Sequence, residues 1–586
     1  MKWDLTKLYK TLDEWEKDVA YIENMIKDLP NYKGKLGDYD TFLDYYKKQK
    51  EGAVKLMKAY QYAALTSDLN KKDTKNAARV QQMANIVSNL QQATAFEQPE
   101  LIALGKEKVI SFIERDPLLE EYRFSIEKLF HAQEHVLDGE SEGLLANFAN
   151  LSNQGSEVYS ALSIADKEDQ EVTLSDGETI TITSGNFRSY LADLEDAEDR
   201  KKVFRAIFDN YMDNKNTYAQ IYNTILQRDI ANMKSRKYNS SLESYLFGNN
   251  IPTDVYHNLV DVAEASTDLI KRYYKIRKDV LGLKHHHTYD RFMPLAESTT
   301  KYTYKEAQNL FFDSINHLDE NFVKKAQSAI EEGYVDVYEQ EGKRTGAYSW
   351  GSLNQHPYIL LNYDDTLNSV FTLAHEAGHS MHSLFSAENQ PVATQNYTIF
   401  VAEVASTFNE HNLLDYFIHN KNTGKDDKIT LLQQSIDDIL GTFYRQTLFA
   451  TYELRAHELA EKGVPITHET LSEIMIDLYK SYYDIDITEE ESKQFVWAYI
   501  PHLFHTPFYV YQYATSFAAS LKLYEMVKED NANIKHHMDL LKSGGNDFPV
   551  EQIKKAGVDL TTKEPFLAVV NRLETLLDEL ELALKE

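Results

Sequence analysis

The stretch from Thr366 to Phe385, TLNSVFTLAHEAGHSMHSLF, limits what this chain can form more than any other part of it. Its apolar residues recur at close to 3.6 positions, the pattern of an amphipathic helix that begins near Thr366. His375 and His379 are one helical turn apart, so both imidazoles project from one face and can reach one metal ion. The segment therefore predicts a helix that carries part of a metal site.

Glu376 directly follows the first of these histidines and completes the pattern H-E-x-x-H. A carboxylate at this position points beside the metal, where it can take a proton from a metal-bound water and pass it to a leaving amine. We therefore expect Glu376 to be the general base of a hydrolytic site. A polar stripe on the solvent face of an amphipathic helix is the alternative interpretation.

A second helical stretch, Ile399 to Ser406, supplies a candidate for the third metal ligand. Glu403 lies there among largely apolar residues, and a buried carboxylate without a partner is costly. A zinc ion held by His375 and His379 would be such a partner, because two His and one Glu with a water form a known catalytic zinc set. We expect one Zn²⁺ per chain, held by these three residues; a surface position for Glu403 is the alternative.

Two further residues share these helical faces. Glu410 follows Glu403 by two helical turns and could orient a ligand histidine through a hydrogen bond. His382 follows His375 by the same spacing and competes as a ligand. The later Gly and His of the metzincin pattern are missing, so Glu403 is preferred to His382.

The composition of the 586-residue chain is that of a globular protein, with 42% hydrophobic and 26% charged residues. Its formal net charge of −30 argues against nucleic acid or an anionic membrane surface as a partner. The lack of cysteine excludes disulfides, thiolate catalysis and thiolate-bound metals. No apolar run is long enough to cross a membrane, and the charged N-terminus does not resemble a signal peptide, so we expect a cytoplasmic protein.

Helical patterns dominate the chain and Gly and Pro are scarce, so the predicted fold class is mainly α. Two β-rich runs around Asp176-Gly177 predict a hairpin between Val172 and Thr183. A β-rich region from Tyr334 to Tyr363 predicts a small antiparallel sheet beside the HExxH helix, with an edge to which a peptide could add. We divide the chain into a helical N-terminal region, 1–185, which ends in the hairpin, and a catalytic region, 186–586.

A hydrolytic site also needs donors that meet the oxyanion of its tetrahedral intermediate. The stretch from Trp497 to Phe517 is rich in candidates, namely His502, His505, Tyr509, Tyr511 and Tyr513. Tyr509 and Tyr513 would share one helical face as i,i+4 neighbours. Packing in an aromatic core is the alternative for each single tyrosine.

Four separated motifs follow one another along the chain: HPYILLNYDDTLNSVFTLAHEAGHSMH, FVAEVASTFNE, PHLFHTPFYVYQYAT and LLKSGG. In order and spacing they resemble the oligoendopeptidase F group of the thimet-oligopeptidase-like M3 family of zinc peptidases. The resemblance is densest from about residue 186 to the C-terminus. It implies a mainly α, two-lobed ellipsoid around a deep channel, and a zinc endopeptidase limited to short peptides because folded proteins cannot enter.

By position, the resemblance implies the zinc ligands and the general base already named. It also implies that the family's substrate-contacting residues fall at His502 and at Tyr509 or Tyr513. The chain departs from the thimet enzymes at Phe504 to Pro507, where their signature has glycines.

These features together predict a zinc-dependent endopeptidase that hydrolyses internal bonds of short oligopeptides, its expected partners. Two alternatives stay open: an exopeptidase with the same zinc set, and a non-catalytic peptide-binding protein that uses zinc for stability. The intact Glu376 argues against the second. The sequence leaves the oligomeric state and the cleavage preference open.

Overall fold

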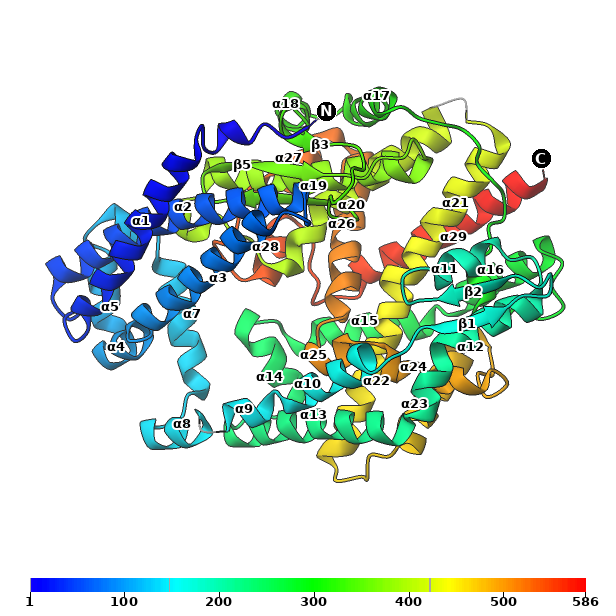
Figure 1. The fold of residues 1–586 in the computed structure, drawn as a ribbon, viewed down its shortest axis with the longest axis horizontal. Coiled ribbons are helices and arrows are strands. Elements are labelled where there is room, and N and C mark those ends of the chain that lie inside the picture. Colours follow the sequence, from blue (N-terminus) through cyan, green and yellow to red (C-terminus); the bar gives the residue numbers. More distant parts are fainter. Residues whose placement is uncertain (1, 147, 421–422, 586) are drawn as a thin grey trace. The chain divides into compact units, whose positions relative to one another are not determined.

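The computed structural model describes residues 2–146, 148–420 and 423–585 (Figure 1). Helices dominate it and two small sheets complete it, which confirms the mainly α fold class. The chain forms two compact units, each assembled from three separated segments. The first comprises Met1–Glu134, Thr300–Lys421 and Ala519–Val558, and the second His135–Thr299, Asn422–Ala518 and Asp559–Glu586. The division at residue 185 stays a prediction.

The first unit contains the HExxH helix. Its helices are α1 (Leu12–Asp28), α2 (Tyr39–Leu69), α3 (Thr74–Thr94), α4 (Glu97–Leu104), α5 (Lys106–Ile113), α6 (Pro117–Glu120), α7 (Arg123–Ala132), α17 (Tyr304–Ile315), α18 (Glu320–Ala329), α19 (Leu367–Asn389), α20 (Ile399–Asp415), α27 (Ile534–Lys542) and α28 (Pro549–Lys555). Its strands are β3 (Val335–Asp336), β4 (Tyr348–Ser352) and β5 (Gln355–Leu360).

The second unit contains the hairpin. Its helices are α8 (Gly139–Ala146), α9 (Ala149–Ser152), α10 (Gln154–Ser160), α11 (Phe187–Asp193), α12 (Ala197–Asp213), α13 (Lys215–Ser235), α14 (Ser241–Leu246), α15 (Thr253–Ala265), α16 (Asp268–Val280), α21 (Lys425–Ile439), α22 (Arg445–Glu461), α23 (His468–Tyr483), α24 (Val496–Tyr499), α25 (His502–His505) and α29 (Glu564–Lys585). Its strands are β1 (Gln170–Thr173) and β2 (Thr179–Ile182), while α26 (Tyr511–Glu529) contributes to both units.

Side-chain caps define where many helices begin. Thr11 accepts a hydrogen bond from the backbone of Glu14 at the start of α1, and Asp38 caps α2 in the same way. Thr303 and Glu306 form a reciprocal capping box at α17. These caps satisfy backbone N–H groups that have no partner inside the helix. No helix within the described residues is long and apolar enough to cross a membrane.

The predicted hairpin is confirmed. β1 pairs antiparallel with β2 from Gln170 opposite Ile182 to Thr173 opposite Thr179. Gly177 has a φ of +90° in the connecting turn, a conformation that glycine adopts without steric cost. The Asp176-Gly177 signal therefore located this turn correctly.

The second sheet is mixed, so the prediction of a wholly antiparallel sheet is wrong. Its strand order is β3-β5-β4, with β4 antiparallel and β3 parallel to β5. The chain between β3 and β4 passes the C-terminal end of β5, because Asp336 at the end of β3 and Tyr348 at the start of β4 both lie opposite Leu360. This connection is held by a buried ion pair of 2.6 Å between Lys343 and Asp336. A parallel pairing of only two residues leaves no alternation that a sequence pattern could reveal.

The sheet joins the N-terminal helices to α19. Tyr358 and Leu360 of β5 belong to the hydrophobic core that α1 and α2 also form, and the Trp3 indole donates a hydrogen bond of 2.8 Å to the Ile359 carbonyl. On the other side, Ser349 of β4 and Ser380 of α19 lie 2.8 Å apart through their hydroxyls. The predicted sheet beside the HExxH helix is thus confirmed, with β4 at its edge.

The Lys343–Asp336 pair generates a stability prediction. Both side chains are fully buried, so Lys343→Met should leave an uncompensated carboxylate and cost about 3–5 kcal/mol of unfolding free energy. Urea denaturation followed by circular dichroism measures the loss. The control is Lys72→Met, whose ion pair with Glu341 is exposed and should contribute less than about 1 kcal/mol. Equal losses of unfolding free energy in the two variants would contradict the claim that the buried pair matters more than the exposed one.

Candidate metal centre

Helix α19 begins where the sequence predicted. The Thr366 hydroxyl accepts a hydrogen bond of 3.3 Å from the Ser369 backbone, and Asp364 accepts one of 2.7 Å from the Ser369 hydroxyl. These contacts fix the first turn of the helix. One turn apart further along it, His375 and His379 lie on the same face.

The three predicted ligands meet at one point. His375 Nε2 and His379 Nε2 are 3.2 Å apart, and Glu403 Oε2 lies 3.4 Å from the first and 3.5 Å from the second. A tetrahedral ion with ligands at about 2.1 Å has edges of about 3.4 Å between ligand atoms. The three atoms therefore already have the spacing of three corners of a zinc site. Among the described residues, these two histidines and one glutamate lie close enough together to hold a metal ion.

Gly378 allows the two ligand-bearing helices to approach this closely. A Cβ at this position would lie 2.5 Å from the Ala405 carbonyl oxygen and 2.6 Å from the Ser406 Cα, both in α20. The Asn409 amide also donates a hydrogen bond of 3.1 Å to the Ala374 carbonyl of α19. The H-E-x-x-H pattern alone does not reveal this role of Gly378. The sequence signal for it is the small residues of both helices, Ala377 and Gly378 in α19 and Ala405 and Ser406 in α20.

Each of the three predicted ligands also makes a hydrogen bond to another group of the protein. His375 Nδ1 lies 3.1 Å from Glu410 Oε1, as predicted for a carboxylate that orients a ligand histidine. The Ser406 hydroxyl donates a 2.8 Å hydrogen bond to Glu403 Oε2. His379 interacts with the backbone of Ala402. The three ligand atoms are thus held in place by the protein itself.

The electrostatics of the group suit a cation. Burial disfavours protonation of His375, but the hydrogen bond and charge of Glu410 outweigh it and raise the His375 pKa to about 9. Burial and the charge of His375 lower the pKa of His379 to about 4. Two facing imidazole nitrogens cannot both carry protons at this distance. A single positive charge placed between the two nitrogens and the Glu403 carboxylate interacts favourably with all three groups.

Glu376 lies beside this group in a groove of about 570 Å³, lined by β4, α19, α20 and residues 395–397. Its side chain is 7% exposed, and its Oε2 has no hydrogen-bond partner within the described residues. Burial, joined by the charge of Glu403, raises the Glu376 pKa to about 7, while a hydrogen bond with the Ser349 backbone opposes the rise. A buried carboxylate with a free oxygen next to a cation site is placed to exchange a proton with a bound water.

His382 takes no part in the group. It is fully buried and stacks on Tyr397 with ring centroids 3.5 Å apart. Burial holds its pKa well below the usual range. The preference for Glu403 over His382 therefore agrees with the geometry.

His502, Tyr509 and Tyr513 lie together in the second unit. The Tyr513 hydroxyl is 3.5 Å from His502 Nε2, and the Tyr509 ring lies 5.8 Å from the His502 ring and 5.5 Å from the Tyr513 ring. All three side chains are partly exposed. Burial lowers the pKa of His502, which favours its neutral form.

The expectation that Tyr509 and Tyr513 share a helical face is wrong, because α26 begins only at Tyr511. The short helix α25 ends at His505, and Pro507 follows it. The next residue, Phe508, has a φ of +54°. The turn, and not a helix, brings the two rings together. Tyr511 itself is buried, with its ring 5.0 Å from that of Tyr256.

His505 has different neighbours from His502. Its Nε2 lies 3.4 Å from the Ser160 hydroxyl, and its ring packs 5.4 Å from the Tyr159 ring. Of the five residues that the sequence singled out in this region, the structure therefore groups His502, Tyr509 and Tyr513.

Comparisons with known proteins cover the whole chain. The model of peptidase family M3 matches residues 190–572, and the model described as oligopeptidase F matches residues 100–168. The chain is 35% identical to oligopeptidase PepF of Bacillus subtilis, over 99% of this chain and 86% of that protein. It is 34% identical to an oligoendopeptidase F homolog of Borreliella burgdorferi, over 99% and 98%.

Solved structures of similar proteins also match nearly the whole chain. Oligoendopeptidase-F from Enterococcus faecium matches with a TM-score of 0.75 and 27% identity, over 98% of this chain and 99% of that one. A solved chain from Chlamydophila abortus matches with a TM-score of 0.89 and 34% identity, over 99% and 98%.

The contact at Gly378 generates a prediction. Gly378→Ala should push α20 from α19 and weaken binding of a divalent metal by at least about tenfold, since a displaced ligand loses most of its contribution. Competition with a chromophoric chelator measures the affinity. Gly441→Ala is the control, because Gly441 is also helical and a Cβ there would meet no atom within 4 Å. Unchanged affinity in Gly378→Ala would refute the close-approach argument.

Proposed function

Because the chain belongs to peptidase family M3 and is a metallo-oligopeptidase, we propose that His375, His379 and Glu403 hold one zinc ion per chain. The observation that carries this proposal is the spacing of the three ligand atoms, 3.2 to 3.5 Å. A zinc ion held there would supply Lewis-acid polarisation of a peptide carbonyl and a water of lowered pKa.

Glu376 acts as the general base in this proposal. Its unpartnered Oε2 accepts a proton from the attacking water, and its buried position keeps that proton until it passes to the nitrogen of the leaving amine. A carboxyl whose pKa lies near 7 can perform both transfers at neutral pH. The Ser349 backbone holds the carboxylate in position between them.

His502, Tyr509 and Tyr513 are the proposed donors to the oxyanion. A phenol O–H, or an imidazole N–H of neutral His502, would stabilise the negative charge on the former carbonyl oxygen. Their mutual contacts and partial exposure support this role, whereas Tyr511 is buried and His505 faces other residues.

The edge strand β4 supports a mode of substrate binding. Its residues line the same groove as Glu376, and its pairing with β5 uses only one of its two edges. We propose that a short peptide adds to β4 by main-chain hydrogen bonds, which hold a substrate without regard to its side chains.

The assignment of the base predicts the behaviour of Glu376→Gln. This variant should keep its zinc but lose kcat on an internally quenched peptide by about 10²- to 10⁴-fold, the usual worth of general acid–base catalysis. Glu388→Gln, a change on the exposed end of the same helix, is the matched control and should keep normal activity. Near wild-type turnover by Glu376→Gln with full zinc content would assign the base elsewhere.

Tyrosine variants test the oxyanion donors. At least one of Tyr509→Phe and Tyr513→Phe should lower kcat more than it raises KM, because the lost hydrogen bond is made mainly in the transition state. Tyr511→Phe serves as the control for loss of a phenol outside the cluster. If neither variant lowers kcat, the oxyanion is stabilised by other groups.

Product masses test the site of cleavage. A peptide of about ten residues, short enough for the proposed regime, should be cut at internal bonds, and a chelator should abolish the reaction. Removal of single terminal residues would favour an exopeptidase with the same zinc set. Zinc that stabilises the fold without any turnover would favour a peptide-binding protein.

A further inference from the structure

Three cationic side chains gather in the second unit without a carboxylate partner. Arg291 lies in the short turn Asp290–Phe292, Arg445 is the first residue of α22, and Lys493 lies in the turn Glu491–Phe495. Their side chains lie over aromatic rings: Arg291 over Phe292, Arg445 over Phe449 and Lys493 over Phe208. No ion pair or side-chain hydrogen bond is made by any of the three within the described residues.

Aromatic rings link these cations into one cluster. The Lys493 ammonium lies 5.5 Å from the Tyr479 ring centroid. Tyr479 lies 5.2 Å from Tyr483, which stacks on Tyr274 at 5.4 Å. Both arginines lie within electrostatic range of these same three phenols. The cluster therefore combines three positive charges with a wall of tyrosines.

The cations repel one another. Burial, together with the charges of Arg445 and Arg291, holds the pKa of Lys493 well below its usual range. Burial and the charge of Arg445 also lower the pKa of Arg291 to about 10. A protein retains such an arrangement at a cost in stability unless an opposite charge joins it.

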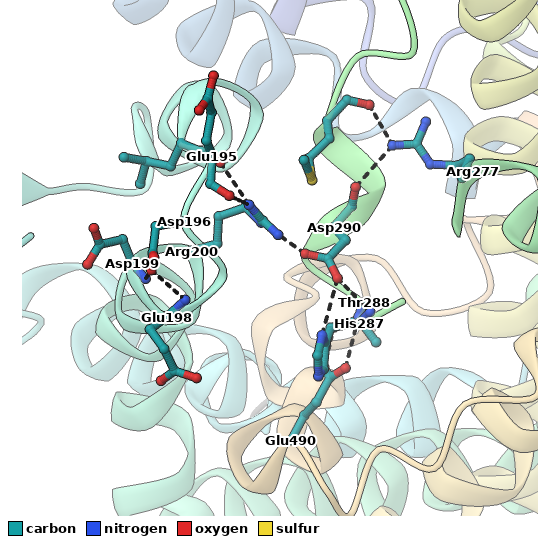
Figure 2. A network of polar contacts seen from close by, with 12 residues as sticks. Glu195, Asp196, Glu198, Asp199, Arg200, Arg277, His287, Thr288, Asp290 and Glu490 are labelled. Atoms are coloured by element: carbon teal, nitrogen blue, oxygen red, sulfur yellow. Dashed lines mark hydrogen bonds and ion pairs between the residues drawn. The ribbon is translucent and has the colours of Figure 1, made fainter. Parts of the chain in front are cut away.

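Two carboxylates that lie close to the cluster in sequence, Asp290 and Glu490, have other partners, as Figure 2 shows. Asp290 pairs with Arg200 at 2.9 Å, with both side chains fully buried. Glu490 accepts hydrogen bonds from the backbone and hydroxyl of Thr288. Neither carboxylate contacts Lys493 or Arg445 within the 4.0 Å of an ion pair.

Asp437 is similarly occupied. It accepts hydrogen bonds from Tyr273 at 2.9 Å and from Gln433 at 3.3 Å. The neighbouring Arg277 donates hydrogen bonds to the main-chain carbonyls of Asp290 and Met293, and no carboxylate accepts from it within the described residues. The local acids are thus fewer than the local cations, in a chain whose net charge is −30.

Further donors of the cluster lie beside the cations. Tyr479, Tyr483 and Lys493 are 3%, 7% and 5% exposed, and no hydrogen bond joins the two hydroxyls or the ammonium to another group within the described residues. These groups can therefore donate hydrogen bonds to an added ligand. Arg291 and Arg445 are partly exposed, so a small ion has access to the cluster from solvent.

We propose that Arg291, Arg445 and Lys493 form a binding site for one small anion, with the phenols as additional donors. Guanidinium groups favour carboxylates, which they can bind with two parallel hydrogen bonds, and they also bind inorganic anions such as chloride. The ligand is therefore either the carboxylate of a peptide terminus or a free inorganic anion. No residue of this site belongs to the metal centre.

Binding of halide to the full-length protein tests the site without any enzymatic activity. In chloride-free buffer, added chloride should show ³⁵Cl NMR line broadening that Arg445→Gln and Arg291→Gln each reduce at least about tenfold, the worth of one charged hydrogen bond. Arg205→Gln is the control, because Arg205 is exposed and paired with Asp209. Crystals of the unchanged protein soaked in bromide should show an anomalous peak between the three cations.

Lys493→Met separates a ligand site from a structural role. If the cluster awaits an anion, this variant should raise Tm in chloride-free buffer and remove the Tm gain that chloride gives the unchanged protein. If Lys493 serves only to pack against aromatic rings, the variant should lower Tm and keep the halide broadening, which would overturn the proposal.

A peptide with a free C-terminal carboxylate and the same peptide as an amide distinguish the two sources of the anion. This comparison rests on the proposed peptidase function. If the ligand is a peptide terminus, a substrate with a free C-terminal carboxylate should have a KM about tenfold below that of its amide, and Arg291→Gln should abolish the difference. If the ligand is a free anion, carboxylate and amide should behave alike while halide binding persists. Absence of halide broadening, of a bromide peak and of any carboxylate preference would overturn the proposal, even in a fully active enzyme.

Discussion

The close contact of α19 with α20 is the constraint on which the site depends. Gly378 provides it, since any larger residue would place its Cβ 2.5 Å from the Ala405 carbonyl. The contact brings Glu403 to the two histidines, and the sheet fixes α19 from the other side through Ser349 and Ser380. The proposed metal ligands thus come from two helices in direct contact, an arrangement that favours a preorganised site.

Both proposed ligand sites share one physical feature, which is that groups of like character lie close together. At the metal centre, two imidazole nitrogens and a carboxylate oxygen lie 3.2 to 3.5 Å apart, and all three can donate an electron pair to one cation. In the second unit, the positive charges of Arg291, Arg445 and Lys493 disfavour one another beside the same phenols. Folding energy must offset both arrangements, and buried pairs such as Lys343–Asp336 satisfy their charges internally instead.

The shared face of His375 and His379 could be predicted from sequence because helical periodicity fixes which residues project together. The Asp176-Gly177 turn could be predicted because it requires a residue with positive φ, which glycine adopts without steric cost. The parallel strand β3 could not, since a two-residue pairing leaves no pattern. Tyr509 was assigned to a helix because the left-handed turn at Phe508 has no glycine to mark it. The cationic cluster joins residues far apart in sequence, and only the fold brings them together.

Anomalous diffraction at the zinc absorption edge tests the central claim, that the protein forms the metal site before the metal binds. Crystals of the zinc-loaded protein should show one peak at about 2.0–2.2 Å from His375 Nε2, His379 Nε2 and Glu403 Oε2. Metal-free crystals should show the same three side chains displaced by less than about 0.5 Å. A peak at other residues, or ligands that assemble only when zinc is present, would contradict the account.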